Sequence, residues 1–252
     1  MRRFVAHWLG RVPYAQAHAL QEQILRARIA GAVGDTVLLL EHDPVITLGR
    51  TVRAHNILVS RAELANQGIE VHETGRGGDV TYHGPGQLVA YPIFDLRPNR
   101  CDVRRYVRDL AHVMIGISQD MGIEASFLEG DPKLVGVWVD ADRPTRWAGD
   151  PRLPGGAKVA AKIGAIGVRI SRWVTMHGFA YNVSTDLRAY RWIVPCGIAQ
   201  YGVTSVVASG IRPPAMESIA RSTLPHFERV FDAHGEWAAP HDSRSMRSLV
   251  ST

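Results

Sequence analysis

The feature that most constrains the fold of this chain is a glycine-rich segment at residues 75–87, which holds five of the 24 glycines. It lies between two stretches, 69–73 and 88–95, whose residues predict strands. Adjacent glycines let a backbone adopt special geometry and approach a ligand closely. We therefore expect a ligand-contacting loop between two strands. The segment matches neither the dinucleotide-binding pattern nor the phosphate-binding P-loop, so neither of those sites is expected.

Hydrophobic periodicity predicts the elements around this segment. Apolar residues at helical spacing predict helices at 14–30, 61–67, 102–120 and 214–232, with Asp102 as the N-cap of the third. Apolar runs predict strands at 36–41, 45–49, 69–73, 88–95, 134–139, 162–170 and 173–183. Helices and strands do not alternate strictly, which favours one α/β domain around a mixed sheet. We assign residues 1–235 to this domain and 236–252 to a flexible tail.

Composition narrows the class of protein. A chain of 252 residues fits one domain, and no apolar run approaches the roughly 18 residues that span a bilayer. The start at Met1-Arg2-Arg3 lacks a secretory cleavage site, so we expect a cytoplasmic protein. A net charge of +5 would attract acidic partners, but the chain has no nucleic-acid-binding motif. The 11 histidines lack metal-ligand spacing, so no metal site is expected.

The two cysteines leave two interpretations open. A lone cysteine is more often a small buried apolar residue than a nucleophile. Cys101 lies at the start of a predicted helix, outside any motif, and we interpret it as structural. Cys196 stands between Pro195 and Gly197, a context that fits either a buried turn or an exposed nucleophile.

The segment Arg76-Gly77-Gly78-Asp79-Val80-Thr81-Tyr82-His83-Gly84-Pro85-Gly86-Gln87 resembles the signature of the lipoyl(octanoyl) transferase family throughout. Similar segments recur along residues 4–232. They are 41–50, 136–139, 162–168, 175–183, 193–198 and 202–205. This resemblance implies a single domain with the lipoate/biotin protein ligase-like fold, an α/β fold with a mixed sheet.

The resemblance also implies the reacting residues. Cys196 would carry the acyl group as a thioester, and Lys162 would activate the thiol and act as acid and base. A neighbouring ammonium favours the thiolate, which is the nucleophilic form. Lys158 is a rival for the lysine role, and His83 is a second choice as base. The acyl pocket would be lined by Arg76, Gly77, Gly78, Asp79, Val80, Thr81, Tyr82, His83, Ala165, Ile166, Gly167, Gly178, Phe179 and Ala180.

The implied activity is transfer of an octanoyl group from octanoyl-acyl carrier protein to the acceptor lysine of lipoyl domains. The expected acceptors are the acyltransferase subunits of 2-oxoacid dehydrogenases and the glycine cleavage H protein. No cofactor, nucleic acid or membrane is implied, and a monomer is expected. Three alternatives remain: an ATP-dependent lipoate or biotin ligase, an amidotransferase acting between lipoyl domains, and a non-catalytic acyl- or carrier-binding module.

Overall fold

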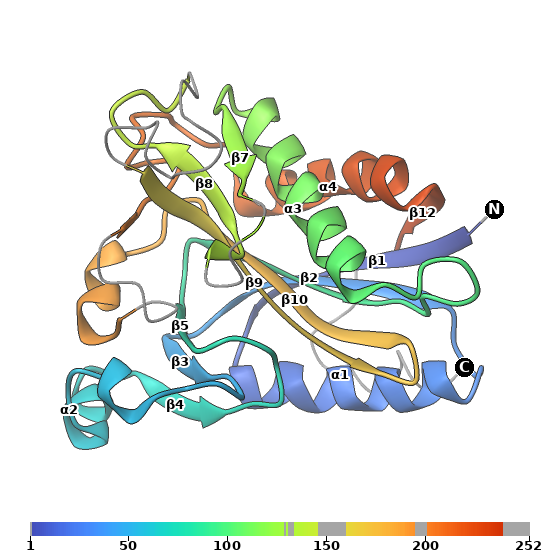
Figure 1. Cartoon of the computed structure of the whole chain (residues 1–252), viewed down its shortest axis with the longest axis horizontal. Helices are drawn as coiled ribbons and strands as arrows, with labels where there is room; N and C mark the ends of the chain where they lie inside the picture. The colour runs from blue at the N-terminus through green and yellow to red at the C-terminus, as the bar shows by residue number, and fades with distance from the viewer. Residues whose placement is uncertain (1, 129, 131–133, 146–159, 195–200, 239–252) are drawn as a thin grey trace.

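A computed structural model describes residues 2–128, 130, 134–145, 160–194 and 201–238 of the chain (Figure 1). Its α-helices are α1 (Tyr14–Ile29), α2 (Arg61–Asn66), α3 (Val103–Asp120) and α4 (Met216–Phe231), and its 3-10 helices are η1 (Ala54–Asn56) and η3 (Leu187–Trp192). Its strands are β1 (Arg2–Val12), β2 (Asp35–His42), β3 (Val45–Leu48), β4 (Glu70–Glu73), β5 (Val80–His83), β6 (Gln87–Ile93), β7 (Ala125–Phe127), β8 (Val137–Asp140), β9 (Ala160–Ser171), β10 (Val174–Asn182), β11 (Gly202–Val203) and β12 (Ala233–Trp237).

The strands form two sheets. The large one has nine strands in the order β12-β1-β2-β6-β10-β9-β8-β7, with β11 beside β9. It is mixed, because β1 pairs in parallel with β2 and β12, while β2 through β7 pair antiparallel along this path. The small sheet has the order β4-β3-β5. The predicted α/β architecture around a mixed sheet is therefore what the chain adopts.

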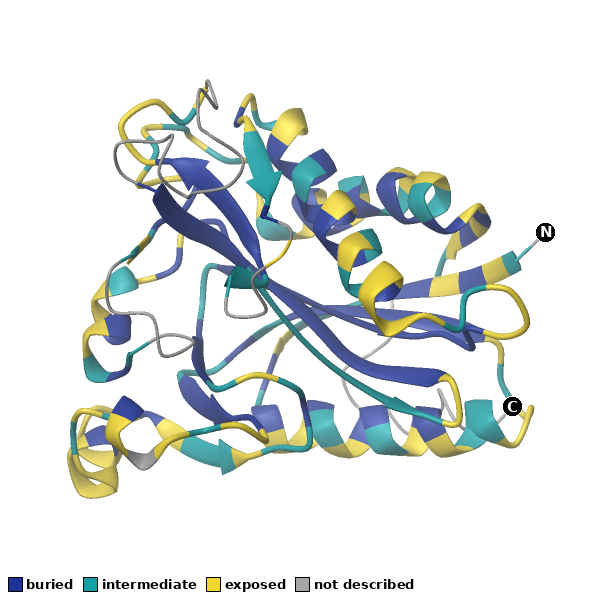
Figure 2. Ribbon diagram, in the orientation of Figure 1, coloured by how far each residue is buried: buried dark blue, intermediate teal, exposed yellow. Residues whose placement is uncertain are grey.

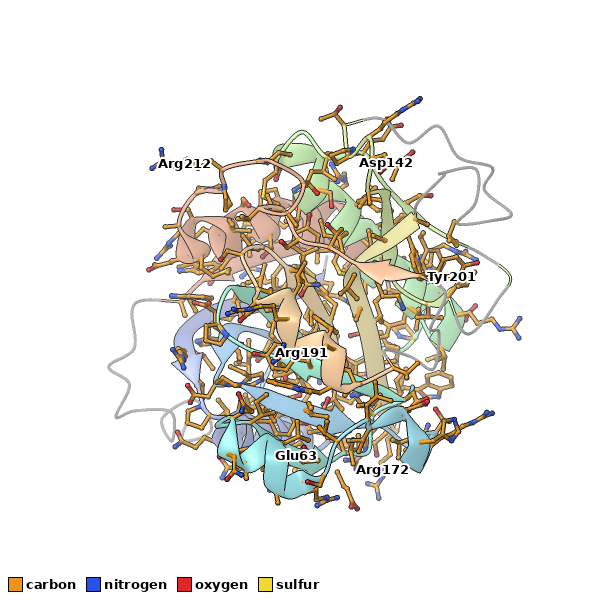
Figure 3. The ribbon with its side chains drawn as sticks, turned by 90° about the vertical axis from the view of Figure 1, so that its left-hand side faces the viewer. Glu63, Asp142, Arg172, Arg191, Tyr201 and Arg212 are labelled. Carbon is orange, nitrogen blue, oxygen red and sulfur yellow. The ribbon has the colours of Figure 1, made fainter. Side chains whose placement is uncertain are left out.

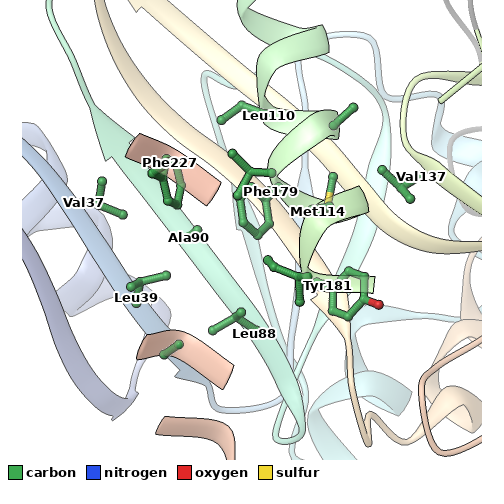
Figure 4. Packing of buried hydrophobic residues seen from close by; sticks show 14 of the residues in the cluster. Val37, Leu39, Leu88, Ala90, Leu110, Met114, Val137, Phe179, Tyr181 and Phe227 are labelled. Carbon is green, nitrogen blue, oxygen red and sulfur yellow. The ribbon is translucent and has the colours of Figure 1, made fainter. Parts of the chain in front are cut away.

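Helices cover both faces of the large sheet. Figure 1 shows α3 and α4 on one face and α1 on the other, with the small sheet at the lower left, beside the start of α1. A cluster of buried side chains from β2, β6, β9, β10, α3 and α4 fills the first interface, where Phe179, Met114 and Phe227 meet (Figure 4). A second cluster joins α1 to the opposite face, and a third lies under the small sheet. The central strands β6 and β10 are thus buried along their whole length (Figure 2).

The predicted helices form for the expected local reasons. The Asp102 carboxylate caps α3 by accepting hydrogen bonds from the backbone N–H groups of Arg104 and Arg105. Ser60 and Glu63 form a capping box at the start of α2, which satisfies two backbone donors. Among the described residues, no helix is long and apolar enough to cross a membrane.

Two predictions need correction. The segment 75–87 is not loop throughout, because Val80–His83 forms β5 and pairs with β3. The β-branched and aromatic residues of that stretch favour a strand despite the flanking glycines. The domain extends beyond residue 235, because Glu236 and Trp237 belong to β12 and pair with Val5 and Ala6 of β1. Residues 239–252 of the predicted tail lie outside the described residues.

A bulge in β9 decides which side chains share a face. Trp138 pairs with Lys162, but the preceding Val137 pairs with Gly164, so β9 has one extra residue there. Such a bulge shifts the alternation of side chains by one residue. Ile163 and Ile166 consequently both pack in the cluster under α3 and α4. Lys162 then shares the opposite face with Ala165 and Gly167.

Candidate active site

The glycine loop is held against the end of β3 by backbone hydrogen bonds. The N–H groups of Gly49 and Arg50 donate to the carbonyl oxygens of Asp79 and Arg76 over 2.9 and 3.0 Å. Position 49 tolerates only glycine, because a Cβ there would lie 2.1 Å from the carbonyl oxygen of Gly78. Gly78 itself has a φ of +89°, a conformation that glycine adopts without strain. These contacts hold the glycine loop, residues 75–79, rigidly against β3, and we call this loop and the end of β3 the cradle.

Arg76 is a buried anchor of this cradle. Its guanidinium donates to the carbonyl oxygen of Thr47 at 2.7 Å, to the Thr47 hydroxyl at 3.0 Å, and to the carbonyl oxygen of Gly77 at 3.1 Å. Several donors in a fixed plane make arginine suited to hold two backbone segments together. The side chain thus fixes the loop on β3 and places a positive charge beside the cavity described next.

A cavity lies between the glycine loop and the β9–β10 ladder. The structure places around it every residue predicted for the acyl pocket except Gly77 and Tyr82. Gly77 instead donates its N–H to the carbonyl oxygen of Val168 at 2.8 Å, which ties the loop to β9. Tyr82 points away and packs edge-on against Tyr190. The lining residues are Tyr14, Thr47, Arg76, Gly78, Asp79, Val80, Thr81, His83, Tyr91, Ala165, Ile166, Gly167, His177, Gly178, Phe179 and Ala180.

Small residues make room along the cavity walls. Ala165 and Gly167 on β9 lie opposite Ala180 and Gly178 on β10. At Gly178 a Cβ would lie 2.2 Å from the carbonyl oxygen of Ala90, so the close approach of β6 excludes any other residue. These positions leave a passage between the β9–β10 ladder and the glycine loop.

Four lining residues were not predicted as pocket residues: Tyr14, Thr47, Tyr91 and His177. They come from α1, β3, β6 and β10, so only the fold brings them together. The hydrophobic periodicity predicts a helix over residues 14–30, but it gives no sign that this helix meets a cavity.

Three buried histidines lie at or behind the cavity, and burial keeps them neutral. Desolvation lowers the pKa of His42 to about 4 and the pKa of His83 and His177 to about 3. The hydrogen-bond network assigns the tautomer of His42, because Nδ1 lies 2.7 Å from the carbonyl oxygen of Val12, which only accepts. His42 Nε2 therefore accepts from the Tyr91 hydroxyl at 2.7 Å. His42 lies behind the cavity rather than in its wall.

His83 is placed as a structural link rather than as a free base. Its Nδ1 contacts Gln87 Oε1 at 2.7 Å, and its Nε2 lies 3.4 Å from the Thr47 hydroxyl. The Gln87 amide nitrogen donates to Asn182 Oδ1 at 2.9 Å, so Gln87 Oε1 is the acceptor and His83 Nδ1 carries the proton. Both ring nitrogens of His83 thus have partners within the fold.

His177 has an unusual backbone. Its φ is +58°, in the left-handed region that histidine adopts more often than most residues. By strict alternation its side chain would share the face of Phe179, under α3 and α4. Instead its ring lies 5.7 Å from the ring of His18 on α1. Its backbone N–H donates to the side-chain oxygen of buried Gln21 at 3.0 Å, which holds this conformation.

Lys162 lies at the start of β9 with 6% of its surface exposed. Its ammonium donates to the carbonyl oxygen of Val135 at 3.1 Å and lies 4.8 Å from the centroid of the Trp138 ring. The ring face attracts a cation, and the contact is strongest when water is excluded. Gly136, with φ +146°, permits the close approach, since a Cβ there would lie 3.0 Å from the Lys162 Cε.

Cys196 and Lys158 lie outside the described residues. The chain is described up to Val194, whose N–H donates to the carbonyl oxygen of Asn56 at 2.8 Å. The described chain resumes at Tyr201, and Val203 of β11 then pairs with Lys162 of β9. Figure 3 shows this side of the molecule, with Arg191 on η3 and Tyr201 at the start of the second segment. Cys101 lies elsewhere, with its Sγ 3.7 Å from the carbonyl oxygen of Leu96.

Comparison with known proteins identifies the family. Residues 13–228 match the model of the lipoyl protein ligase A/B catalytic domain. The chain belongs to this family. It is 46% identical over 238 residues to an octanoyltransferase of Acidobacterium capsulatum, covering 91% of this chain and 90% of that one. It is 46% identical over 232 residues to an octanoyltransferase of Solibacter usitatus, covering 92% and 94%. An octanoyltransferase of Myxococcus xanthus is 45% identical over 240 residues, which are 95% of this chain but only 63% of that protein.

Solved structures agree on the fold. The bipartite lipoate protein ligase of Thermoplasma acidophilum aligns with a TM-score of 0.69 at 14% identity, covering 100% of this chain and 93% of that one. A lipoate-protein ligase A bound with ATP aligns with a TM-score of 0.68 at 13% identity, covering 100% and 95%. The predicted family and the predicted ligase-like fold are therefore confirmed.

Proposed function

We propose that this chain is an acyltransferase that moves an octanoyl group from octanoyl-acyl carrier protein to the acceptor lysine of a lipoyl domain. The observation that carries the proposal is the 46% identity to proteins named octanoyltransferase over nine-tenths of the chain. The cavity supports it, because small residues on β9 and β10 line a passage that suits an alkyl chain and that lies further along β9, the strand that carries Lys162.

The proposed nucleophile is Cys196, with Lys162 as its partner. Cys196 is seven residues before Val203 in the sequence, and Val203 pairs with Lys162. The buried ammonium of Lys162 is held by Val135 and Trp138. An ammonium beside a thiol stabilises the thiolate and can then return a proton to the leaving group.

The reaction has two steps. The Cys196 thiolate attacks the thioester carbonyl of the donor, the carrier's thiol leaves and takes a proton, and an octanoyl-enzyme thioester forms. The acceptor lysine amine then attacks this thioester and loses a proton. The amide forms and the Cys196 thiol is released. The second step is favourable because an amide is more stable than a thioester. Each tetrahedral intermediate requires donors for its oxyanion, and the Gly77 N–H is excluded because it already bonds Val168.

The partners follow from this chemistry. The net charge of +5 favours an acidic carrier protein as donor. We propose lipoyl domains of 2-oxoacid dehydrogenases and the glycine cleavage H protein as acceptors, and a monomeric, cytoplasmic enzyme that needs no cofactor.

The test is an intact-mass measurement. The purified protein is incubated with octanoyl-acyl carrier protein without ATP, beside Cys196→Ala and Cys101→Ala variants. We expect an added octanoyl mass on wild type and on Cys101→Ala only, removed by an unmodified lipoyl domain that then gains it. An adduct on Cys196→Ala would refute the assigned nucleophile. Transfer that requires free octanoate and ATP would show a ligase, and preference for an octanoylated lipoyl domain as donor would show an amidotransferase.

A further inference from the structure

The cavity runs along the β9–β10 ladder away from Lys162. Ala165 pairs with Ala180 on the Lys162 side, and Val168 pairs with His177 at the other end. Val168 is three residues beyond Ala165, and a strand advances about 3.3 Å per residue, so the two positions are about 10 Å apart. This distance is close to the length of an extended eight-carbon acyl chain. An acyl group with its carbonyl on the Lys162 side therefore ends near His177.

This far end differs from the walls, where the polar groups of Arg76, His83 and Tyr91 have partners within the fold. The hydroxyl of Tyr14 and the Nε2 of His177 are both buried, and neither has a hydrogen-bond partner among the described residues. Both residues line the cavity. His18 links them, since its ring lies 5.8 Å from that of Tyr14 and 5.7 Å from that of His177. Buried polar groups almost always have a partner, so these two need one from inside the cavity, either a water molecule or a polar atom of a ligand.

The backbone of His177 makes this end polar. Its left-handed φ and the hydrogen bond from its N–H to Gln21 turn the ring to the α1 side. A side chain following the normal alternation would leave the cavity lined at this point by Gly178 and its apolar neighbours. The position thus stores backbone strain in order to present a hydrogen-bonding ring, and such strain is commonly found at functional sites.

We propose that Tyr14 and His177 form a polar floor that sets the upper limit of acyl-chain length. An octanoyl chain fills the passage and stops short of the floor. A chain two carbons longer would press its terminal methylenes against the Tyr14 hydroxyl and His177 Nε2 and exclude the partner that both require. Leaving a buried polar group unsatisfied is costly. The polar groups of the walls escape this penalty, because Arg76, His83 and Tyr91 keep their partners within the fold. This inference rests on the proposed octanoyl transfer and deepens it.

The test compares donor chain lengths in the variants Tyr14→Phe and His177→Asn. Tyr14→Phe removes only the hydroxyl, which bonds no described residue, so the fold should be kept. Asparagine tolerates a left-handed backbone and is shorter than histidine. Transfer rates to a lipoyl domain are measured with hexanoyl-, octanoyl-, decanoyl- and dodecanoyl-acyl carrier protein. We expect the decanoyl-to-octanoyl rate ratio to rise roughly tenfold in Tyr14→Phe, the factor typical of one unsatisfied buried polar group.

The matched control is Tyr106→Phe, which removes another buried tyrosine hydroxyl, in the cluster under α3 and away from the cavity. Its ratio should equal that of wild type. A raised ratio in either floor variant supports the proposal. Unchanged ratios in both, with unfolding temperatures near that of wild type, would overturn it.

A binding measurement separates this inference from the proposed function. If wild type transfers no acyl group from any donor, the proposed function fails, and the floor is then tested with free fatty acids. Octanoate should raise the unfolding temperature of wild type more than decanoate does, because binding to the native state stabilises it. In Tyr14→Phe the two shifts should become equal or reverse. The same preference for octanoate in wild type and Tyr14→Phe would refute the floor.

Discussion

The three buried neutral histidines should make this fold sensitive to mild acid. His42, His83 and His177 have pKa values near 4, 3 and 3 because burial disfavours their charged forms. In the unfolded chain a histidine has a pKa of about 6.5. Below that pH the unfolded state therefore binds more protons than the native state, and stability falls with decreasing pH. The loss begins as the pH falls through about 6.5 and continues to the low native pKa values.

The magnitude follows from this difference. At pH 5.5, one unit below the unfolded pKa, each histidine that stays neutral in the native state costs about 1.4 kcal/mol. Three such residues cost about 4 kcal/mol, against a total stability of about 5–15 kcal/mol for a typical domain. Carboxylates such as Asp95 and Asp186 have lowered pKa values and stay ionised at pH 5.5, so they do not contribute.

The assay is urea unfolding at pH 7.5, 6.5 and 5.5 at constant ionic strength. His42→Gln should reduce the stability lost between pH 7.5 and 5.5 by about one third, or about 1.4 kcal/mol. The control is His112→Gln on the exposed face of α3, which should leave the loss unchanged. A loss below about 1 kcal/mol for wild type would mean that these histidines take up protons within the folded protein, and the reasoning would be wrong.

Two further predictions concern single contacts. Trp138→Leu should slow formation of the acyl-enzyme by roughly tenfold, because it removes the aromatic ring under the Lys162 ammonium. Trp138→Phe keeps an aromatic ring and should retain most of the rate. Equal rates for the two variants in a stopped-flow comparison would refute the role of the ring. Asp102→Ala should lower the free energy of unfolding in urea titrations by about 1 kcal/mol, because it removes the N-cap of α3. Asp102→Asn should lower it much less, because asparagine is also a good N-cap. Equal losses in the two variants would show that the negative charge of Asp102 matters rather than the cap.

Much of the fold could be predicted because its signals are local. The helix at 102–120 has an N-cap and a periodic apolar face, and both are features of adjacent residues. Strand β2 is an unbroken apolar run that the sheet buries on both sides. β1 was missed because the exposed position between buried Phe4 and Ala6 is Val5, so apolar and polar residues do not alternate there, and because Gly10, which has a φ of +65°, interrupts the strand.

Residues of the candidate site could be predicted only where they lie in a sequence motif of the family. The family signature led to the glycine loop and to the paired residues on β9 and β10, which do surround one cavity. Tyr14, Tyr91 and His177 belong to no shared motif: Tyr91 and His177 meet across the neighbouring strands β6 and β10, and the packing of α1 on the sheet adds Tyr14. The direction of the His177 ring depends on a left-handed φ, which no residue pattern predicts. The bulge that aligns Lys162 with Ala165 is likewise a property of strand pairing.

The pairing of β1 with β12 has a consequence for how the protein is made. Arg2 to Ala6 lie in register with Ala233 to Trp237, so a large part of the polypeptide separates two neighbouring strands. Contacts between such distant residues raise the contact order and slow folding. While the chain is being synthesised, β1 can pair with β2 but leaves its outer edge open until β12 leaves the ribosome. An open edge is prone to join other chains, so nascent protein should be more prone to aggregate than the finished molecule.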